Sequence, residues 1–433
     1  MLYCFMKLAK VQTRQCQIDG VQVLASALAF LLPFMSLVVE GGVHIGQVAV
    51  LLVAIWLLNK GLPGFYARNE HAIRWTVAGF VGYFLISLAR LLYFHQALHT
   101  LDGPSRLLLA LSCIGVIACL KPDVRWFWLG LCSGTIGAAI IALIQRFAFG
   151  IERVEGFTHH PITFGDLAVA MGAMSLCALT ALRQTRFALL PIVALFAGVA
   201  VAVLSESRGA WLGFLLVLPP LLKFGGKMHG RVLWYGAGIV LLACVGAYFV
   251  PALGIARRVA EAVSEVNQYF TVQNAGTNVG VRLELWKASL MMIAEHPWLG
   301  VGRDAFHASL QAMAAQGRLQ HSTALEFSSS HNDVLNTLAT GGILDLSFLL
   351  LMYAGPLMFF WKVLKSSSGE RAALGLTGLV LVICFIGFGL TDVMFWLMIT
   401  KVFYAMMVCT IMGFCLATST HAPAAPAHTD SPG

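Results

Sequence analysis

The chain has 433 residues, of which 59% are hydrophobic and only 11% are charged, and its mean hydropathy is +0.81. So few polar side chains cannot cover a water-soluble globule of this size, which excludes a soluble fold. The net charge of +8 does not indicate a nucleic-acid partner, because the basic residues are scattered at the ends of apolar stretches instead of forming one stripe.

The apolar stretches predict an all-α integral membrane protein, because a helix crosses the hydrocarbon core with about 20 apolar residues. We expect about 12 transmembrane helices on this criterion. They are residues 21–39, 43–58, 75–95, 105–120, 125–149, 162–182, 187–204, 209–222, 232–250, 342–361, 372–390 and 394–416. The shortest, 43–58 and 209–222, would look the same if they were broken or re-entrant segments.

Basic residues mark alternate connections between these spans, and Lys and Arg concentrate on the cytoplasmic side of short loops. With the N-terminus inside, every predicted inside connection carries Lys or Arg, whereas the outside turns 40–42 and 391–393 carry neither. We expect the first span to remain as an anchor instead of being removed as a signal peptide. Residues 419–433 are rich in Ala, Pro and Thr, and we expect a disordered cytoplasmic tail there.

One long polar segment, residues 251–341, divides the nine spans predicted in residues 1–250 from the three predicted in 342–418. A connection of this length usually has a function of its own. Apolar residues recur at helical spacing in 255–270 and 281–294, so we expect two amphipathic helices in a large outer loop, the second ended by Pro297. The expected apolar stripes are Ile255, Val259, Val263, Val266 and Phe270 in the first helix, and Leu283, Trp286, Leu290 and Ile293 in the second.

Arg208 lies in a short outer turn between two apolar stretches, close to the hydrocarbon. A charge at membrane depth costs about 2.5–3.5 kcal/mol and normally pairs or lines a polar cavity. Glu206 could supply an internal ion pair, and the other interpretation is a binding site for a phosphate-bearing ligand. The sequence leaves both interpretations open.

His331 follows three serines and precedes an apolar helix. A neutral imidazole can accept a proton at physiological pH, although a single His at such a junction is also compatible with a surface or capping residue. Asp333 would point to another face of a helix and is not expected to orient it. The pair His159 and His160 has no Cys or carboxylate at ligand spacing, so neither a metal site nor another cofactor is expected.

Three motifs in this order carry a family resemblance over roughly residues 150 to 400. They are Ser207-Arg208-Gly209-Ala210-Trp211, the run from Arg282 to Trp286 that leads to His296-Pro297-Trp298-Leu299-Gly300-Val301-Gly302, and Ser330-His331-Asn332 followed about ten residues later by glycine. With them the chain resembles the bacterial O-antigen ligase family, within a superfamily that includes O-antigen polymerases and bacterial O-oligosaccharyltransferases.

The resemblance implies a GT-C-like membrane glycosyltransferase in the bacterial inner membrane, with its active site on the periplasmic face. Such an enzyme moves a glycan from undecaprenyl diphosphate to a sugar hydroxyl of lipid A-core oligosaccharide in lipopolysaccharide biosynthesis. The implied partners are these two lipid-linked substrates and membrane lipids. The donor arrives already activated, so no nucleotide or other cofactor is implied.

The resemblance also suggests roles for individual residues. His331 would be the catalytic base, and Arg208 and Arg282 would bind the donor diphosphate and stabilise its growing charge. Direct attack by the acceptor hydroxyl predicts inversion without a covalent intermediate or a metal. The further expected neighbours of this site are Ser207, Asn332, Arg153 and His160.

Other functions remain open at this stage. An O-antigen polymerase would use the same donor with a second lipid-linked glycan, and a protein O-oligosaccharyltransferase would use a Ser or Thr side chain. From another class, a secondary transporter would make Arg90 or Lys401 indispensable instead of His331. Arg90 and Lys401 fit either a transport pathway or charged groups that reach toward the membrane surface.

Overall fold

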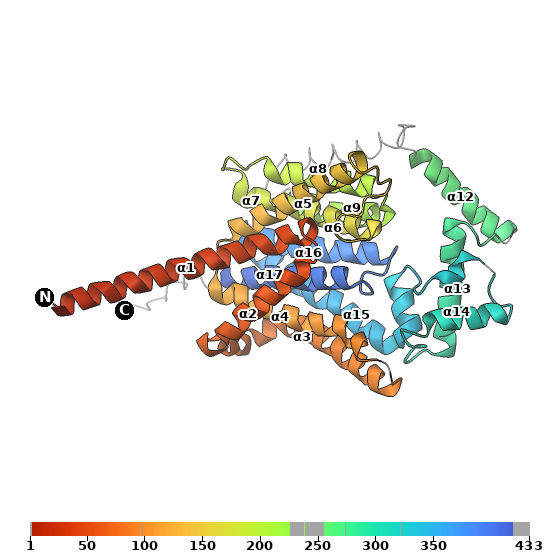
Figure 1. The fold of residues 1–433 in the computed structure, drawn as a ribbon, viewed down its shortest axis with the longest axis horizontal. Coiled ribbons are helices and arrows are strands. Elements are labelled where there is room, and N and C mark those ends of the chain that lie inside the picture. The colour runs from red at the N-terminus through yellow and green to blue at the C-terminus, as the bar shows by residue number, and fades with distance from the viewer. Residues whose placement is uncertain are drawn as a thin grey trace, which may run out of the picture.

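The computed structural model describes residues 2–95, 97–225, 238, 255–272, 274–320 and 322–418 (Figure 1). All regular structure in these residues is helical. The main helices are α1 (Leu2–Val38), α2 (Gly42–Leu57), α3 (Leu62–Tyr93), α4 (Asp102–Leu120), α5 (Val124–Phe147), α6 (Pro161–Ser175), α7 (Leu179–Leu182), α8 (Leu190–Leu204), α9 (Arg208–Pro220), α12 (Ile255–Thr271), α13 (Asn278–Glu295), α14 (Phe306–Ala315), α15 (Asp333–Ser366), α16 (Gly369–Gly389) and α17 (Met398–Ala417).

Nine helical segments in the described ranges are long and apolar enough to cross a membrane. They correspond to nine of the predicted spans, and one of them, Leu62–Tyr93, begins well before the predicted residue 75. The shorter helices α8 and α9 occupy the predicted spans 187–204 and 209–222. The predicted span 232–250 and the predicted tail 419–433 lie outside the described residues, so the total of about 12 stays a prediction.

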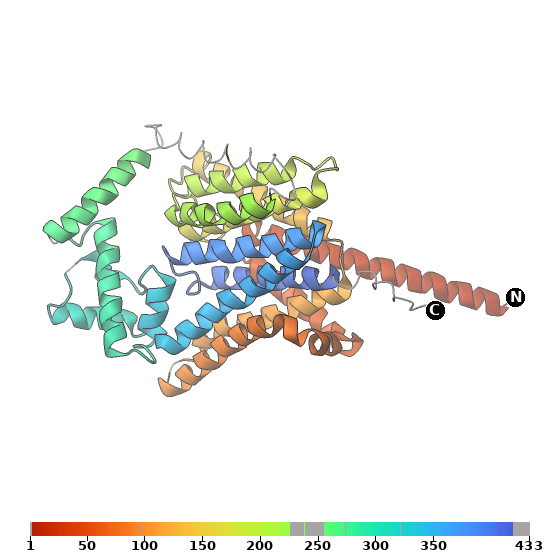
Figure 2. The ribbon, with the colours of Figure 1, turned by 180° about the vertical axis from the view of Figure 1, so that it is seen from behind.

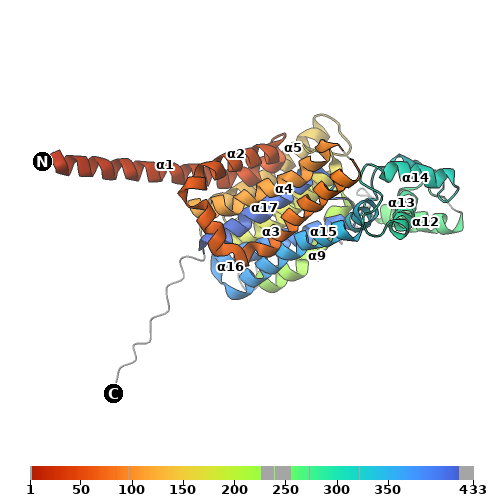
Figure 3. The same ribbon diagram turned by 90° about the horizontal axis from the view of Figure 1, so that it is seen from below.

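The apolar helices form one bundle, and α12, α13 and α14 lie beyond one end of it (Figures 1 and 2). Seen from below, the N-terminal part of α1 extends from the opposite end (Figure 3). At the turns on that opposite end, cations lie over aromatic rings: Lys60 Nζ is 3.4 Å from the Trp56 ring centroid, and Lys365 Nζ is 5.0 Å from that of Trp361. Amphipathic aromatic and basic residues of this kind are typical of a membrane–water interface.

Small residues bring the bundle helices close together. A Cβ atom at Gly130 of α5 would collide with the backbone of Phe30 in α1, and one at Gly198 of α8 would collide with the backbone of Ala168 in α6. Lipid tails are as apolar as the helices, so close packing of this kind replaces hydrophobic burial as the main source of helix association.

The part of the chain that lies beyond one end of the bundle has its own hydrophobic core, formed by α13, α14, the start of α15 and the side chains of Leu319 and Ala324. Leu285, Met292 and Phe306 are fully buried in it, and each such side chain contributes about 1.5–3 kcal/mol. The two amphipathic helices predicted at 255–270 and 281–294 are present as α12 and α13, and α14 is an additional helix that was not predicted from the sequence.

The faces of α12 and α13 differ from the predicted apolar stripes. In α13 the buried line is Val281, Leu285, Ala288 and Met292, whereas Leu290 is 58% exposed. This line packs against α14 and α15 in the hydrophobic core described above, so contacts with these neighbours and not side-chain size decide which face of α13 is buried. In α12, Tyr269 contacts α13 while Phe270 is exposed.

Helix α15 begins at Asp333, inside the range 251–341 that was predicted to be the outer loop. Its backbone breaks at Gly342, where φ is 68° and ψ is −167°, values that only glycine adopts readily. Residues 333–341 therefore form a separate first segment. That segment begins at the candidate site.

Candidate functional site

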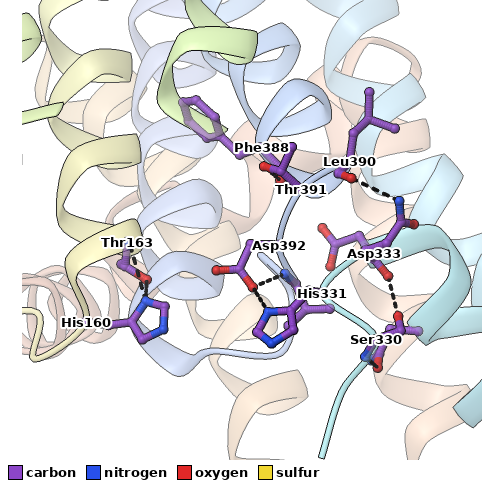
Figure 4. A network of polar contacts seen from close by, with 12 residues as sticks. His160, Thr163, Ser330, His331, Asp333, Phe388, Leu390, Thr391 and Asp392 are labelled. Atoms are coloured by element: carbon purple, nitrogen blue, oxygen red, sulfur yellow. Dashed lines mark hydrogen bonds and ion pairs between the residues drawn. The ribbon is translucent and has the colours of Figure 1, made fainter. Parts of the chain in front are cut away.

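His331 and Asp392 form the centre of the site. His331 Nδ1 lies 3.1 Å from Asp392 Oδ1, and the histidine backbone is in the left-handed region with φ of 51° (Figure 4). The His331 side chain is 20% exposed and that of Asp392 is 5% exposed. The imidazole is therefore accessible on one side and held by a buried carboxylate on the other.

Asp392 is ionised at neutral pH. Burial alone would raise its pKa, but the hydrogen bond and charge of His331 and the hydrogen bond from the Val393 amide lower the pKa below its usual value. The Val393 N–H donates to the same Oδ1 atom at 2.8 Å. An ionised carboxylate only accepts hydrogen bonds, so His331 donates through Nδ1–H, and in the neutral imidazole Nε2 is then the proton acceptor.

The loop between α16 and α17 holds the start of α15 at three successive residues. Besides the bond from His331 to Asp392, Asn332 Nδ2 donates to the Leu390 carbonyl at 3.1 Å, and Asp333 Oδ1 accepts from the Phe395 amide at 3.2 Å. Asn332 is also the N-cap of α15, since its side chain accepts from the Leu335 amide at 3.0 Å. These bonds fix the direction of the His331 side chain.

Helix α13 brings Arg282 to the same place. Trp286, one turn after Arg282, donates from Nε1 to the carbonyl of Ser330 at 3.1 Å, so α13 is bonded to the residue before His331. Burial lowers the pKa of Arg282, the charge of Asp392 raises it, and the charge of Arg208 lowers it. Arg282 therefore lies within electrostatic range of both residues, and its guanidinium remains protonated.

Arg208 is the first residue of α9 and is exposed. Its neighbour Ser207 is buried and structural: it caps α9 by accepting from the Ala210 amide at 3.4 Å and donates to Asp166 Oδ1 at 2.5 Å. Among the ion pairs found within the described residues, none involves Arg208 or Arg282. Two cations near each other without a bonded carboxylate suit a ligand with more than one negative charge.

His160 and Arg153 complete the expected neighbours. His160 is the N-cap of α6, since its Nδ1 accepts from the Thr163 amide at 3.3 Å, and it lies on the other side of Asp392 from His331 (Figure 4). Burial lowers the pKa of His160, with Asp392 acting against this shift and His331 and Arg153 adding to it. Arg153 is exposed and donates from Nε to the Ser205 carbonyl at 3.3 Å, which holds the turn before Arg208.

The adjacent histidines do not converge on one point. His159 pairs with Glu40 at 3.1 Å, whereas His160 caps α6. Within the described part of the chain, no group of three or more His, Cys, Asp or Glu side chains could hold a metal ion.

Comparison with known proteins covers the segment that contains all three principal residues. Residues 192–350 match a family model described as O-antigen ligase, and this range includes Arg208, Arg282 and His331. Over this segment the chain is similar to the O-antigen ligase family. Asp392, Arg153 and His160 lie outside the matched range, so the candidate site also uses helices that flank the matched segment.

Two curated relatives bear the name O-antigen ligase. The one from Escherichia coli K12 is 27% identical over 202 residues, which are 45% of this chain and 44% of the relative. The one from Pseudomonas aeruginosa is 35% identical over 85 residues, 20% of this chain and 19% of the relative. An uncharacterized protein of Haemophilus influenzae is 24% identical over 308 residues, 70% of this chain and 77% of that protein. The alignments thus cover less than half of either named ligase.

Asp392 was not identified from the sequence, because it sits in an apparently featureless turn between two apolar spans. A signal was nevertheless present in the sequence. Asp392 is the only Asp, Glu, His, Lys or Arg between Arg371 and Lys401. A single carboxylate kept between two apolar spans indicates a buried partner.

Proposed function

We propose that this protein is an O-antigen ligase that transfers a glycan from undecaprenyl diphosphate to a sugar hydroxyl of lipid A-core oligosaccharide. The observation that carries the proposal is the hydrogen bond between His331 and the buried Asp392, with Arg282 in electrostatic range of Asp392. A base held by a carboxylate next to a cationic anion site suits nucleophilic attack on a sugar that leaves a diphosphate. The reaction would take place on the periplasmic face of the inner membrane.

In the proposed step, Nε2 of His331 takes the proton of the acceptor hydroxyl. The hydroxyl oxygen then attacks the anomeric carbon, and the bond from that carbon to the diphosphate oxygen breaks. The imidazolium that forms is stabilised by Asp392, and general-base assistance of this kind contributes about 10²–10⁴ in rate. One displacement at the anomeric carbon inverts its configuration.

Arg282 and Arg208 have the complementary task in this proposal. The leaving diphosphate gains negative charge as the glycosidic bond breaks, and guanidinium groups bind phosphate oxygens through paired N–H donors. Arg282 is partly buried and Arg208 is exposed. Arg282 would therefore stabilise the transition state more strongly, while Arg208 at the start of α9 would mainly capture the donor.

The test is transfer by the purified protein from undecaprenyl-diphosphate-linked glycan to lipid A-core, without nucleotide and with EDTA present. We expect transfer by the wild type and loss of transfer in His331→Ala, Arg208→Ala and Arg282→Ala. His307→Ala and Arg146→Ala are matched controls: His307 and Arg146 are exposed and hydrogen-bond to the nearby carbonyls of Phe327 and Glu152. NMR of the product should show an inverted anomeric configuration.

Other outcomes would redirect the assignment. Lengthening of the donor chains without transfer to lipid A-core would identify a polymerase, and transfer to Ser or Thr side chains would identify a protein O-oligosaccharyltransferase. A donor that stays intact in every condition, together with loss of substrate movement in Lys401→Met, would support a transporter. Retention of anomeric configuration would overturn the single-displacement step.

A further inference from the structure

Arg90 stands at the break in α15 and bonds to both halves of that helix. Its Nη2 donates to the carbonyl of Thr340 at 2.9 Å, and its Nη1 forms an ion pair with Asp345. Thr340 lies in the last turn of the first segment of α15, and Asp345 lies in the first turn of the second. Both charged side chains are buried, at 8% and 6% exposure.

A helix break leaves backbone groups without intrahelical partners, and these must be satisfied when buried. Here the segment before α14 supplies most of them. Val301 N–H donates to the Ala339 carbonyl at 2.9 Å, Gly302 N–H donates to the Thr340 carbonyl at 3.0 Å, and Ile343 N–H donates to the Pro297 carbonyl at 2.9 Å. The Thr340 carbonyl thus accepts from both Gly302 and Arg90.

Residues 333–341 connect the contacts of Arg90 with His331, the candidate base. Residues 333–341 form a rod with a rise of about 1.5 Å per residue, so the break lies roughly 12–15 Å from His331. The other end of that rod carries Asn332 and His331. Arg90 belongs to the last turn of α3, and α3 therefore fixes one end of the rod while the loop between α16 and α17 fixes the other.

We infer that Arg90 and Asp345 are positioning residues for the proposed reaction: by clamping the break at Gly342 they hold the segment 333–341, and with it the imidazole of His331, in the reactive position. The bonds found for Arg90 join it to Thr340 and Asp345 and not to His331. The pair affects the reaction through the rigid segment 333–341, which lies between the pair and His331. A displacement of about 1 Å at the reacting groups lowers a rate by about 100-fold, so loss of the clamp reduces turnover without a change at the anion site.

The inference rests on the proposed function for its kinetic part only. In Asp345→Asn and Arg90→Gln we expect kcat to fall by about 10–100-fold while the KM for the lipid-diphosphate donor stays within about twofold. Hydrogen–deuterium exchange of the amides in 333–341 should become about tenfold faster in the same variants. Tyr66→Phe is the control on the same helix: it removes the bond from Tyr66 to the Leu111 carbonyl, 2.7 Å long, at a distance from the break.

A double variant separates positioning from stability. Replacing both charges by apolar side chains, in Arg90→Met with Asp345→Leu, removes the desolvation cost of the pair and should restore thermal stability. The Thr340 carbonyl loses its guanidinium donor in that protein, so kcat should stay low and exchange in 333–341 should stay fast. Wild-type kcat in this double variant would overturn the inference.

The exchange measurement also distinguishes failure of the clamp from failure of the proposed function. If the wild type transfers no glycan at all, the proposed function fails, but faster exchange in 333–341 would still support the clamp. If exchange in this segment is unchanged in folded Asp345→Asn and Arg90→Gln, the clamp is refuted whatever the reaction.

Discussion

Asp392 Oδ1 lies 3.1 Å from Nδ1 of His331, although 61 residues separate the two in the chain. The bond joins the start of α15 to the loop between α16 and α17. It determines which imidazole nitrogen carries the proton, and hence which nitrogen is free to react.

Replacement of Asp392 by Asn should reduce turnover strongly while leaving donor binding nearly unchanged. An amide can donate to Nδ1, which favours the tautomer with the proton on Nε2 and so removes the base. We expect kcat to fall by about 10²–10⁴-fold, from the usual size of general-base and tautomer effects. Steady-state transfer kinetics measure this, with the exposed Asp304→Asn as control. Full activity in Asp392→Asn would show that His331 needs no carboxylate partner.

The acid sensitivity of folding should depend on His160. Burial lowers its pKa in the folded protein, so the unfolded chain binds more protons and stability decreases as the pH falls below the unfolded value of about 6.5. His160→Asn keeps an N-cap acceptor without titrating, and its loss of Tm between pH 7.5 and pH 5 should be smaller than that of the wild type. His159→Asn, at an exposed neighbour, should behave like the wild type.

The linkage of Asp392 has the same sign as that of His160, because its folded pKa is also lowered, but it acts at lower pH. Its folded pKa is lower than the usual value, so the stability it contributes is present above the unfolded pKa of about 3.9 and is lost only as the pH falls through the folded pKa. Asp392→Asn should therefore lower Tm at both pH 7.5 and pH 5. Thermal unfolding at both values, read by intrinsic fluorescence, would contradict this if the difference disappeared at pH 5.

Trp286→Phe should loosen the connection between the proposed anion site and the base. The substitution keeps an aromatic ring and removes only the bond from Nε1 to the Ser330 carbonyl, which contributes about 0.5–1.5 kcal/mol to stability. We expect kcat to fall by about tenfold because His331 loses one of its backbone anchors. Trp298→Phe is the matched control, since Trp298 is 69% exposed. Equal kinetics of the two variants would remove Trp286 from the site.

Two variants of Asn332 should show separately the effect of capping α15 and the effect of the bond to the loop between α16 and α17. Asn332→Ala removes the cap of α15 and should lower stability by about 0.5–2 kcal/mol, whereas Asn332→Asp keeps a capping oxygen. Both variants lose the donor to the Leu390 carbonyl. We therefore expect Asn332→Asp to keep the Tm of the wild type, whereas its kcat should be as low as that of Asn332→Ala. Wild-type values of both Tm and kcat in Asn332→Asp would show that the bond to the Leu390 carbonyl has no role in the reaction.

The sequence predicted the helical membrane architecture and three candidate site residues, whose roles stay a prediction. Hydropathy acts over about 20 residues, so apolar spans can be read locally, and the bounds of α16 and α17 lie close to the predicted spans 372–390 and 394–416. Arg208, Arg282 and His331 could be proposed as site residues because each lies in a motif that resembles the O-antigen ligase family and carries a charged or titratable group near apolar segments.

Only the tertiary structure decided which residues these three meet. The buried face of α13 depends on its packing against α14 and α15, and the pairs His331 with Asp392 and Arg90 with Asp345 join residues far apart in the chain. Local spacing rejected Asp333 as a partner for His331, but it could not indicate Asp392. Such pairings follow from how helices pack and where a helix breaks, which are properties of the whole bundle and not of any one segment.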